Sequence, residues 1–511
     1  MPAPIKNILI VGGGTAGWVA ATFLNRYLDP ALCRITLVES ETIGTIGVGE
    51  ATVPPLVAFL RAMGIDEAAF MRATSATYKL GIKFIDWQHG GQHGGHHGVD
   101  EAWHPFGYVG APQIGGLPLF HHWLRERQAG REASPYVSYS LQALLGDMHR
   151  GPHPLEGDPR ARSAIIQQGA YAYHLDARAF AGFLRDVATG RGVRHLIDDV
   201  CDVGLDARGF ISRVDTAASG ALHADLFIDC SGFAARLIEG SLGDRFIDWG
   251  DQLLCDSAAV LPLPHDDDFH PYTRSTALKA GWCWRIPLRH RAGNGYVYSS
   301  RFLSKEQAAE ELKAHLGAPD AAPMHLAMKV GRRENFWVRN CVAIGLSAGF
   351  LEPLESTGIY LAQKSVELLL DCFPDTGFDP VLIRQYNRKV AREYDESRDF
   401  IVLHYLLGRR DDTGFWRAAR AVTPSDALAG TLELYDRTGL VEWQRNSLFV
   451  DTSFYSLATG FGRLPQTPHA MAAQMDGERA WQAMQQIKAA NLQLAQALPD
   501  HGELIRKLHS R

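Results

Sequence analysis

A glycine-rich turn near the N-terminus has the spacing that binds a phosphate group. Gly12-x-Gly14-x-x-Gly17 follows an apolar stretch at residues 7–11 and opens a helical pattern. The first glycine allows a tight bend, the second lets a pyrophosphate approach the backbone, and the third permits close helix–strand packing. The helix N-terminus then offers N–H groups to the phosphates. Glu39 ends the next apolar stretch and can accept hydrogen bonds from ribose hydroxyls. These residues predict a dinucleotide site.

A second strand and turn later in the chain favour FAD over NAD as that dinucleotide. Residues 224–230 have a strand pattern and are followed by Ser231-Gly232-Phe233. Single dinucleotide folds for NAD usually lack such a distant return to a similar turn. A glycine turn without a ligand is the alternative, and the fitting strand, helix and carboxylate disfavour it.

Two further groups of residues could do chemistry. Trp282 and Trp284 occupy alternate positions of a strand pattern, so both indoles face one side, either as a wall or as core packing. Four histidines lie in the glycine-rich segment 88–98, without a carboxylate or cysteine among them: His89, His93, His96 and His97. Such a backbone does not preorganise ligands, so the segment is interpreted as a surface loop, and no metal site is predicted.

The elements that must position these residues indicate an α/β fold. A strand at 7–11, a helix at 18–27 and a strand at 34–38 form a βαβ unit of the Rossmann-like, FAD-binding type. A third strand at 341–344 leads to a helix at about 359–372, and residues 281–288 and 295–300 resemble antiparallel sheet facing the substrate. Beyond about residue 379 helical periodicity dominates. We therefore expect an FAD-binding domain with an inserted sheet at 1–380 and a mainly helical part at 381–511 that covers the substrate.

Composition excludes several classes of protein. The 511 residues are 46% hydrophobic and 21% charged with a net charge of −6, which gives no basic footprint for nucleic acid. The 7 cysteines are odd in number and scattered, so no disulfide framework is indicated. No apolar run approaches the roughly 20 residues of a membrane span. We expect a cytoplasmic protein that does not bind membranes.

Several stretches together resemble the flavin-dependent tryptophan halogenase family over most of the chain. They are Gly12-Gly13-Gly14-Thr15-Ala16-Gly17-Trp18, Gly47-Val48-Gly49-Glu50-Ala51-Thr52, Tyr78-Lys79-Leu80-Gly81, Tyr173-His174-Leu175-Asp176, Trp282-Cys283-Trp284-Arg285-Ile286-Pro287 and Glu352-Pro353-Leu354-Glu355-Ser356-Thr357-Gly358-Ile359. The resemblance implies an enzyme in which reduced FAD, oxygen and halide give hypohalous acid for an aromatic substrate.

The resemblance also implies a role for particular residues. Cofactor contacts are expected at Gly12, Gly14, Thr15, Ala16, Gly17, Glu39, Gly49, Ala51, Gly358 and Ile359. The halide, chloride or bromide, is expected at the backbone of Thr357 and Gly358, and the indoles of Trp282 and Trp284 are expected to wall the flavin from the substrate.

The implied catalytic residues are Lys79 and Glu355. Lys79 would polarise hypohalous acid by hydrogen bonding or form a haloamine, and both remain open. Glu355 would orient the oxidant and accept the proton from the arene. Without the resemblance, Lys79 would be interpreted as a solvated charge and Glu355 as a helix cap.

The substrate region departs from the family pattern. His104 and Phe106 match the ring-sandwiching His-x-Phe, and Phe454 stands near an expected tryptophan. However, residues 446–462 contain neither a glutamate nor a Tyr-Tyr pair to grip an amino acid. An amine without a counter-charge is poorly held in a partly buried pocket, so we expect indole or a substituted indole rather than free tryptophan.

The implied partners follow from an absence in the sequence. No second dinucleotide fingerprint for NADH is visible, so reduced FAD must be supplied externally by a separate NADH-dependent flavin reductase. A homodimer is expected only because homodimers are common.

Two rival functions remain. An FAD-dependent aromatic monooxygenase would have no use for Lys79 and usually carries Gly-Asp where this chain has Gly345-Leu346-Ser347. A redox-inert flavoprotein would bind FAD and yield no product.

Overall fold

The computed structural model describes residues 2–42, 49–88, 100–110, 113–155, 171–265, 267–442 and 447–510. The chain divides into two compact units, each assembled from three segments. Unit 1 comprises Met1–Ser75, Leu175–Asp251 and Ala327–Arg398, and unit 2 comprises Ala76–His174, Gln252–Leu326 and Asp399–Arg511. The units therefore interleave along the chain, and the single boundary near residue 380 stays a prediction of the sequence.

Unit 1 is built on a six-stranded sheet in the order β21-β22-β12-β1-β2-β8. Its strands are β1 (Asn7–Val11), β2 (Arg34–Glu39), β8 (Arg194–Ile197), β12 (Leu226–Asp229), β21 (Trp337–Val338) and β22 (Cys341–Ala343). The central strand β1 pairs in parallel with both β2 and β12. Because β1 is covered on both faces, its residues form one continuous apolar run rather than an alternating pattern. The predicted α/β class is confirmed.

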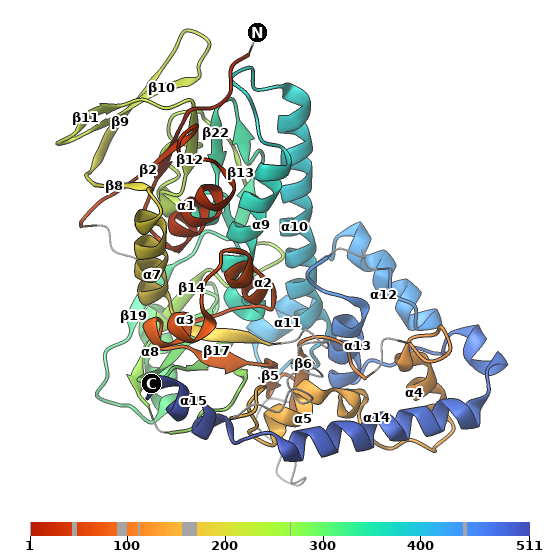
Figure 1. Cartoon of the computed structure of the whole chain (residues 1–511). Coiled ribbons are helices and arrows are strands. Elements are labelled where there is room, and N and C mark those ends of the chain that lie inside the picture. The colour runs from red at the N-terminus through yellow and green to blue at the C-terminus, as the bar shows by residue number, and fades with distance from the viewer. Residues whose placement is uncertain are drawn as a thin grey trace. The chain divides into compact units, whose positions relative to one another are not determined.

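Helices cover this sheet (Figure 1). Unit 1 contains α1 (Thr15–Tyr27), α2 (Pro55–Ala62), α3 (Glu67–Ala73), α7 (Ala177–Gly190) and α9 (Gly358–Asp371). The helix α1 packs against both α7 and α9, so its residues from Gly17 to Leu24 are all buried. Small side chains such as Ala20 and Ala21 allow this close approach on two sides.

Smaller sheets complete unit 1. One comprises β9 (Val200–Leu205), β10 (Ile211–Thr216) and β11 (Gly220–Leu222), and another β13 (Phe246–Asp248), β20 (Gly331–Arg333) and β23 (Gly349–Phe350).

Unit 2 is built on the mostly antiparallel sheet that the alternating sequence predicted. The order is β19-β14-β18-β17-β16-β5-β6, with β15 (Leu263–Pro264) pairing with β18. The strands are β5 (Gly81–Ile85), β6 (Glu101–Pro105), β14 (Ser257–Val260), β16 (Thr273–Leu278), β17 (Gly281–Pro287), β18 (Arg291–Tyr298) and β19 (Met324–Ala327). A short strand, β4 (Thr77–Lys79), pairs antiparallel with β7 (Ala172–Asp176).

Helices form the late part of the chain, as predicted. The helix α10 (Pro380–Leu407) begins in unit 1 and ends in unit 2, which also contains α4 (Leu119–Gln128), α5 (Leu141–Asp147), α8 (Lys305–Leu316), α11 (Gly414–Arg420), α12 (Asp426–Thr438), α13 (Asp451–Gly460), α14 (Gly477–Ala497) and α15 (His501–His509). Within the described residues, no helix is both long and apolar enough to cross a membrane.

Candidate active site

The glycine turn of unit 1 is a place where side chains do not fit. Gly12 has φ +110°, and a Cβ there would lie 2.1 Å from the Cys230 carbonyl oxygen. A Cβ on Gly17 would lie 2.0 Å from the Gly12 oxygen. Both glycines are therefore required by the backbone itself, as the sequence predicted.

Gly14 differs from these two, because a Cβ there would meet nothing within 4 Å. It is the N-cap residue of α1, and no side chain caps the helix. No acidic residue lies in its first turn either. The open space in front of Thr15 and Ala16 therefore fits a pyrophosphate, which would receive backbone N–H groups and the positive helix end. These residues fit FAD.

Glu39 closes β2 beside this turn. Its Oε1 lies 2.7 Å from Nε2 of His195 on β8, and that imidazole packs edge-on against Trp18 at 5.0 Å. A Cβ on Gly13 would lie 1.7 Å from the other oxygen, Oε2. The carboxylate is thus held against the turn by a histidine, leaving Oε2 on the glycine side. No pattern in the sequence pointed to His195, which lies 156 residues from Glu39.

The turns after β12 and β22 meet at the same sheet edge, since both strands run parallel with β1. Asp229 ends β12, and its carboxylate accepts hydrogen bonds from the N–H groups of Leu237 and Ile238, each at 2.9 Å. Its role is to hold the loop. Gly345 has φ +76°, and a Cβ there would lie 2.4 Å from Cβ of Ala16. The turn after β22 therefore presses on the glycine turn. The return that the sequence predicted is the turn after β12, whose Cys230 carbonyl lies against Gly12.

The Glu355 loop leads into α9. Glu355 is fully buried, Ser356 adopts φ +61°, and Thr357 is the N-cap residue of α9. Gly358 begins the helix, is exposed, and would have nothing within 4 Å of an added Cβ. No side chain caps α9 and no acidic residue occupies its first turn. This geometry suits a small anion at the backbone of Thr357 and Gly358. Ile359, predicted to contact the cofactor, is buried in the same turn.

The motif at residues 47–52 contains a titratable group, Glu50, for which the sequence analysis predicted no role. Gly49 and Ala51 lie in β3 (Gly49–Ala51), and Glu50 stands between them. Burial raises the pKa of Glu50 from its ordinary value of 4.5 to about 7. Residues 47 and 48 lie outside the described residues.

Lys79 belongs to unit 2 and is completely buried on β4. Its Nζ lies 5.0 Å from the centroid of the Phe106 ring. Phe106 is fixed by its N–H, which donates to the Leu80 oxygen at 2.8 Å. His104 lies on β6, with its ring 6.5 Å from that of Phe106. The structure therefore brings together Lys79, Phe106 and His104, which are three of the predicted residues.

His104 has an aromatic neighbour that was not among the predicted site residues. Phe449 lies 6.1 Å from His104 and stacks on Phe400 at 3.8 Å. Phe454 is fully buried on α13, with its ring 5.0 Å from Tyr435. Sequence reasoning missed Phe400 and Phe449, although Phe449 lies in the same segment as Phe454.

Trp282 and Trp284 lie on β17, with ring centroids 6.2 Å apart. They are 1% and 7% exposed. Trp284 packs over Gly295 of β18, where a Cβ would lie 2.1 Å from the indole. Cys283, between them, instead joins a core cluster with Tyr296 and Leu312. The two indoles thus share one side of the strand, as predicted.

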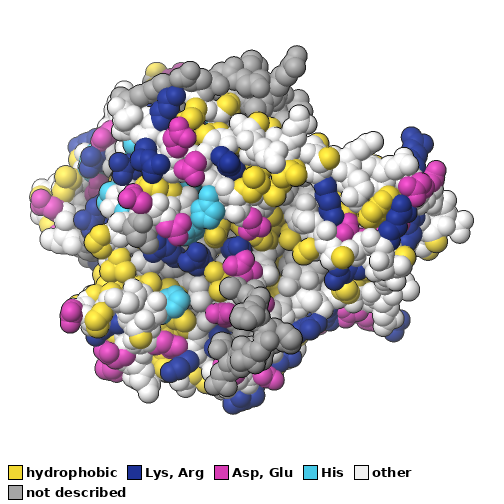
Figure 2. Space-filling model, turned by 90° about the horizontal axis from the view of Figure 1, so that it is seen from below, with side chains coloured by type: hydrophobic (Ala, Val, Ile, Leu, Met, Phe, Trp, Pro, Cys, Tyr) yellow, Lys and Arg dark blue, Asp and Glu magenta, His cyan; other side chains and the backbone are white. Residues whose placement is uncertain are grey.

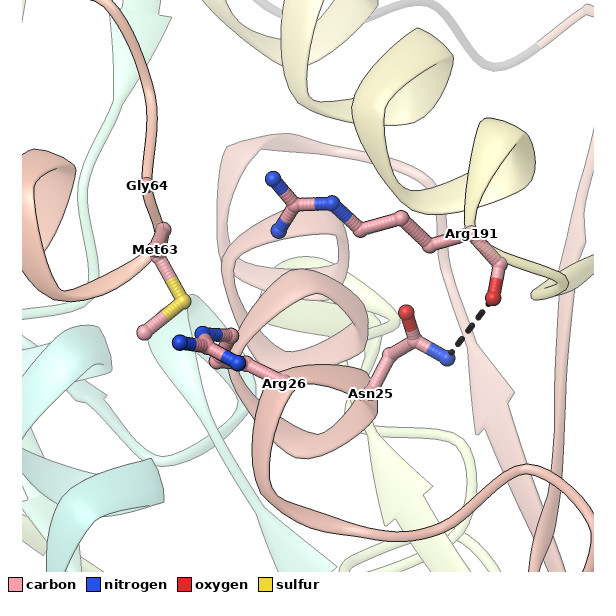
Figure 3. A pocket seen from close by; sticks show the side chains of 5 residues that line it. All are labelled: Asn25, Arg26, Met63, Gly64 and Arg191. Carbon is pink, nitrogen blue, oxygen red and sulfur yellow. Dashed lines mark hydrogen bonds between the residues drawn. The ribbon is translucent and has the colours of Figure 1, made fainter.

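A surface pocket of about 390 Å³ lies elsewhere in unit 1 (Figure 3). Its lining residues are Asn25, Arg26, Met63, Gly64 and Arg191. They come from the C-terminal ends of α1, α2 and α7, and the amide of Asn25 donates to the Arg191 oxygen at 3.3 Å. The guanidinium of Arg26 donates to the Ala62 oxygen at 3.2 Å. Arginine is the expected complement of helix C-terminal carbonyls. None of the five lining residues is among the predicted site residues, so this pocket is distinct from the predicted halogenation site.

The histidines at 89, 93, 96 and 97 lie outside the described residues. Among the residues that are described, no group of three or more His, Cys, Asp or Glu side chains could hold a metal ion. On the face seen in Figure 2, basic and acidic side chains are interspersed without an extended basic patch.

Comparisons with known proteins place these features in one family. A family model described as tryptophan halogenase matches residues 7–477. The chain is 38% identical to the tryptophan 7-halogenase RebH of Lentzea aerocolonigenes, with 100% of both chains covered. It is similar to the structure of Xcc4156, a flavin-dependent halogenase from Xanthomonas campestris, with TM-score 0.90, 38% identity and 98% of each chain covered. For BrvH, a flavin-dependent halogenase from Brevundimonas sp. BAL3, the TM-score is 0.89 and the identity 38%, covering 98% of this chain and 99% of the other.

Proposed function

The chain belongs to the tryptophan halogenase family and is an FADH2-dependent halogenating enzyme. We propose that it halogenates indole or a substituted indole, with Lys79 as a catalytic residue. The observation that carries this proposal is a lysine without solvent exposure beside the Phe106 ring. Burying an ammonium group is costly, so a fully buried lysine beside an aromatic ring is a candidate for a chemical role.

Reduced FAD and oxygen supply the oxidising power that converts halide to hypohalous acid. In the proposal, the glycine turn and Glu39 hold the dinucleotide, with Gly14 giving the pyrophosphate its approach. The halide, chloride or bromide, binds at the backbone N–H groups of Thr357 and Gly358. Gly49, Ala51 and Ile359 line the cofactor. A separate NADH-dependent flavin reductase provides the reduced FAD.

Lys79 acts on the oxidant in the second part of the proposal. Its Nζ–H donates a hydrogen bond to the oxygen of hypohalous acid, which makes the halogen more electrophilic. The arene lies against His104 and Phe106, and the proton that leaves its ring passes to the Glu355 carboxylate. Trp282 and Trp284 keep the flavin from reacting with the arene directly.

The substrate class follows from the charges near the aromatic cluster. Residues 446–462 contain no glutamate, and their one carboxylate belongs to Asp451. Its Oδ1 accepts a hydrogen bond from the Thr452 N–H at 2.8 Å, and burial raises the pKa of Asp451. Burial that disfavours the ionised form makes this carboxyl a weaker partner for an ammonium group. A neutral indole meets no such difficulty.

A single assay tests the proposal. The protein is incubated with FAD, a flavin reductase, NADH, oxygen, chloride or bromide, and either indole or L-tryptophan, and the products are weighed. We expect a halogen on indole at a kcat/KM about tenfold or more above that for tryptophan. Preference for tryptophan would overturn the substrate proposal alone. Addition of oxygen without halogen would indicate the monooxygenase, and no product the redox-inert flavoprotein.

A further inference from the structure

A buried imidazole lies on the same face of the β4–β7 pair as Lys79. Antiparallel pairing sets Thr77 opposite His174 and Lys79 opposite Ala172. Since alternate residues of a strand share a face, the side chains of Thr77, Lys79 and His174 project to one side. Thr77, Lys79 and His174 are all 0% exposed. Any protonation change of His174 would therefore occur next to the proposed catalytic lysine.

Hydrogen bonds determine which nitrogen of His174 carries the proton. The Thr77 hydroxyl donates to the Pro287 carbonyl oxygen at 2.6 Å, which uses its only proton. Nδ1 of His174 lies 3.3 Å from that same hydroxyl oxygen, so Nδ1 must be the donor. Nε2 then accepts from the Thr273 hydroxyl, at 2.9 Å. Both ring nitrogens are satisfied by a neutral imidazole.

The surroundings also oppose a charge on this ring. Burial lowers the pKa of His174 well below its usual range, and the charges of Lys79, His270 and His501 lower it further. His270 is paired with Asp268, whose Oδ2 lies 3.1 Å from its Nδ1. Nδ1 of His501 donates to the Phe269 carbonyl oxygen, and burial lowers the pKa of His501 to about 4. The His174 ring therefore adds no second positive charge to the face that Lys79 occupies.

We propose that His174 is a positioning residue for Lys79, held as the Nδ1–H tautomer between the hydroxyls of Thr77 and Thr273. The chain from His174 through Thr77 to Pro287 ties the strand that carries Lys79 to the end of the strand that carries Trp282 and Trp284. It fixes where the lysine stands relative to that end of β17. The inference rests on the proposed role of Lys79.

Substitutions at Thr77 test the tie. Thr77→Val removes the hydroxyl and keeps the shape, whereas Thr77→Ser keeps the hydroxyl. We expect Thr77→Val to lower kcat for halogenation about 10- to 100-fold, while KM for the arene, FAD binding and oxidation of reduced FAD stay within about twofold. Thr77→Ser should restore most of the rate. Equal rates for Thr77→Val and the unaltered enzyme would overturn the inference.

A second measurement does not depend on turnover. Nitrogen NMR of histidine-labelled enzyme, with His174 assigned by its loss in His174→Gln, should show a neutral Nδ1–H ring throughout about pH 6–9. Glutamine retains one donor and one acceptor, so His174→Gln should be faster than His174→Ala. A ring that titrates in step with the rate profile, together with equal loss in both variants, would instead make His174 a proton donor. Lys79→Ala, run in parallel, separates the proposed role of His174 from that of Lys79. Halogenation by this variant would overturn the proposed catalytic role of Lys79 itself.

Discussion

The glycine turn of unit 1 and the lysine cluster of unit 2 are built in opposite ways. The turn works through missing side chains, since a Cβ on Gly12, Gly13 or Gly17 would meet a neighbouring oxygen within about 2 Å. The cluster works through large side chains that fill space, with Lys79, Phe106 and Phe449 all buried. One region leaves its backbone open to a ligand, and the other surrounds the Lys79 amine with packed side chains. We therefore expect the glycine turn to lose ligand binding when a methyl group is added, and the lysine cluster to lose activity when a side chain is removed.

Removing the amine should give the largest effect. Lys79→Ala is expected to lower halogenation by about 1,000-fold or more, because it removes the amine that is proposed to polarise the oxidant. FAD binding and oxidation of reduced FAD should persist, as measured by flavin fluorescence and NADH consumption. Loss of FAD binding in this variant would remove Lys79 from the catalytic residues.

Lys83 offers a matched control, since it is also buried and lies four residues on. It is paired with Glu101 and Asp147, and these carboxylates outweigh burial and raise its pKa. Lys83→Met should therefore lower the melting temperature but keep halogenation. A comparable loss of halogenation in both variants would contradict the assignment to Lys79.

Adding a methyl group to the turn should give the next largest effect. Gly14→Ala has open space around its Cβ, so the melting temperature should not change, but the methyl group would occupy the pyrophosphate approach. We expect FAD affinity to fall about 10- to 100-fold. Gly17→Ala should lose stability as well as FAD, because its Cβ would meet the Gly12 oxygen at 2.0 Å. Titration with FAD and thermal melting separate the two, and tight FAD binding by Gly14→Ala would show that the pyrophosphate does not approach there.

The smallest effect concerns Glu50 and depends on pH. Its pKa rises from 4.5 to about 7 in the folded protein, so the folded state retains a proton that the unfolded chain loses. The stability from this group is full below pH 4.5 and is lost as the pH rises through about 7. Glu50→Gln cannot ionise, so its melting temperature should exceed that of the unaltered protein by about 3–6 °C at pH 8 and by little at pH 5. An equal difference at both pH values would show that Glu50 is not the titrating group.

The two regions also differ in how far the sequence could predict them. The glycine turn is contiguous, and its strand, helix and carboxylate follow at fixed spacing, so the residues themselves were enough to predict Gly12, Gly14, Gly17 and Glu39. Lys79 required the family resemblance, because nothing local distinguishes it from a solvated lysine. Phe454 was chosen over Phe449, and both are buried, but only the packing of Phe449 on Phe400 places a ring of this segment near His104.

Contacts between distant segments were beyond the sequence for the same reason. His195 reaches Glu39 only because β8 pairs with β2, and His174 meets Thr77 only because β7 pairs with β4. Strand patterns predict that a strand exists but not which strand lies beside it. The interleaved units share this origin, because their three segments come together through long-range pairing.

The interleaving has a consequence for how the protein is made. The strand β1 ends at residue 11, but its sheet also needs β12 and β22, the last of which begins at residue 341. At typical rates of translation the ribosome needs roughly tens of seconds to synthesise the chain between β1 and β22. Until β12 has been made, the edge of β1 that pairs with it has no neighbour, and until β22 has been made the same holds for the far edge of β12. Such unpaired edges invite aggregation. Yield of folded enzyme should therefore depend on chaperones that shield nascent strands and on slow expression at low temperature.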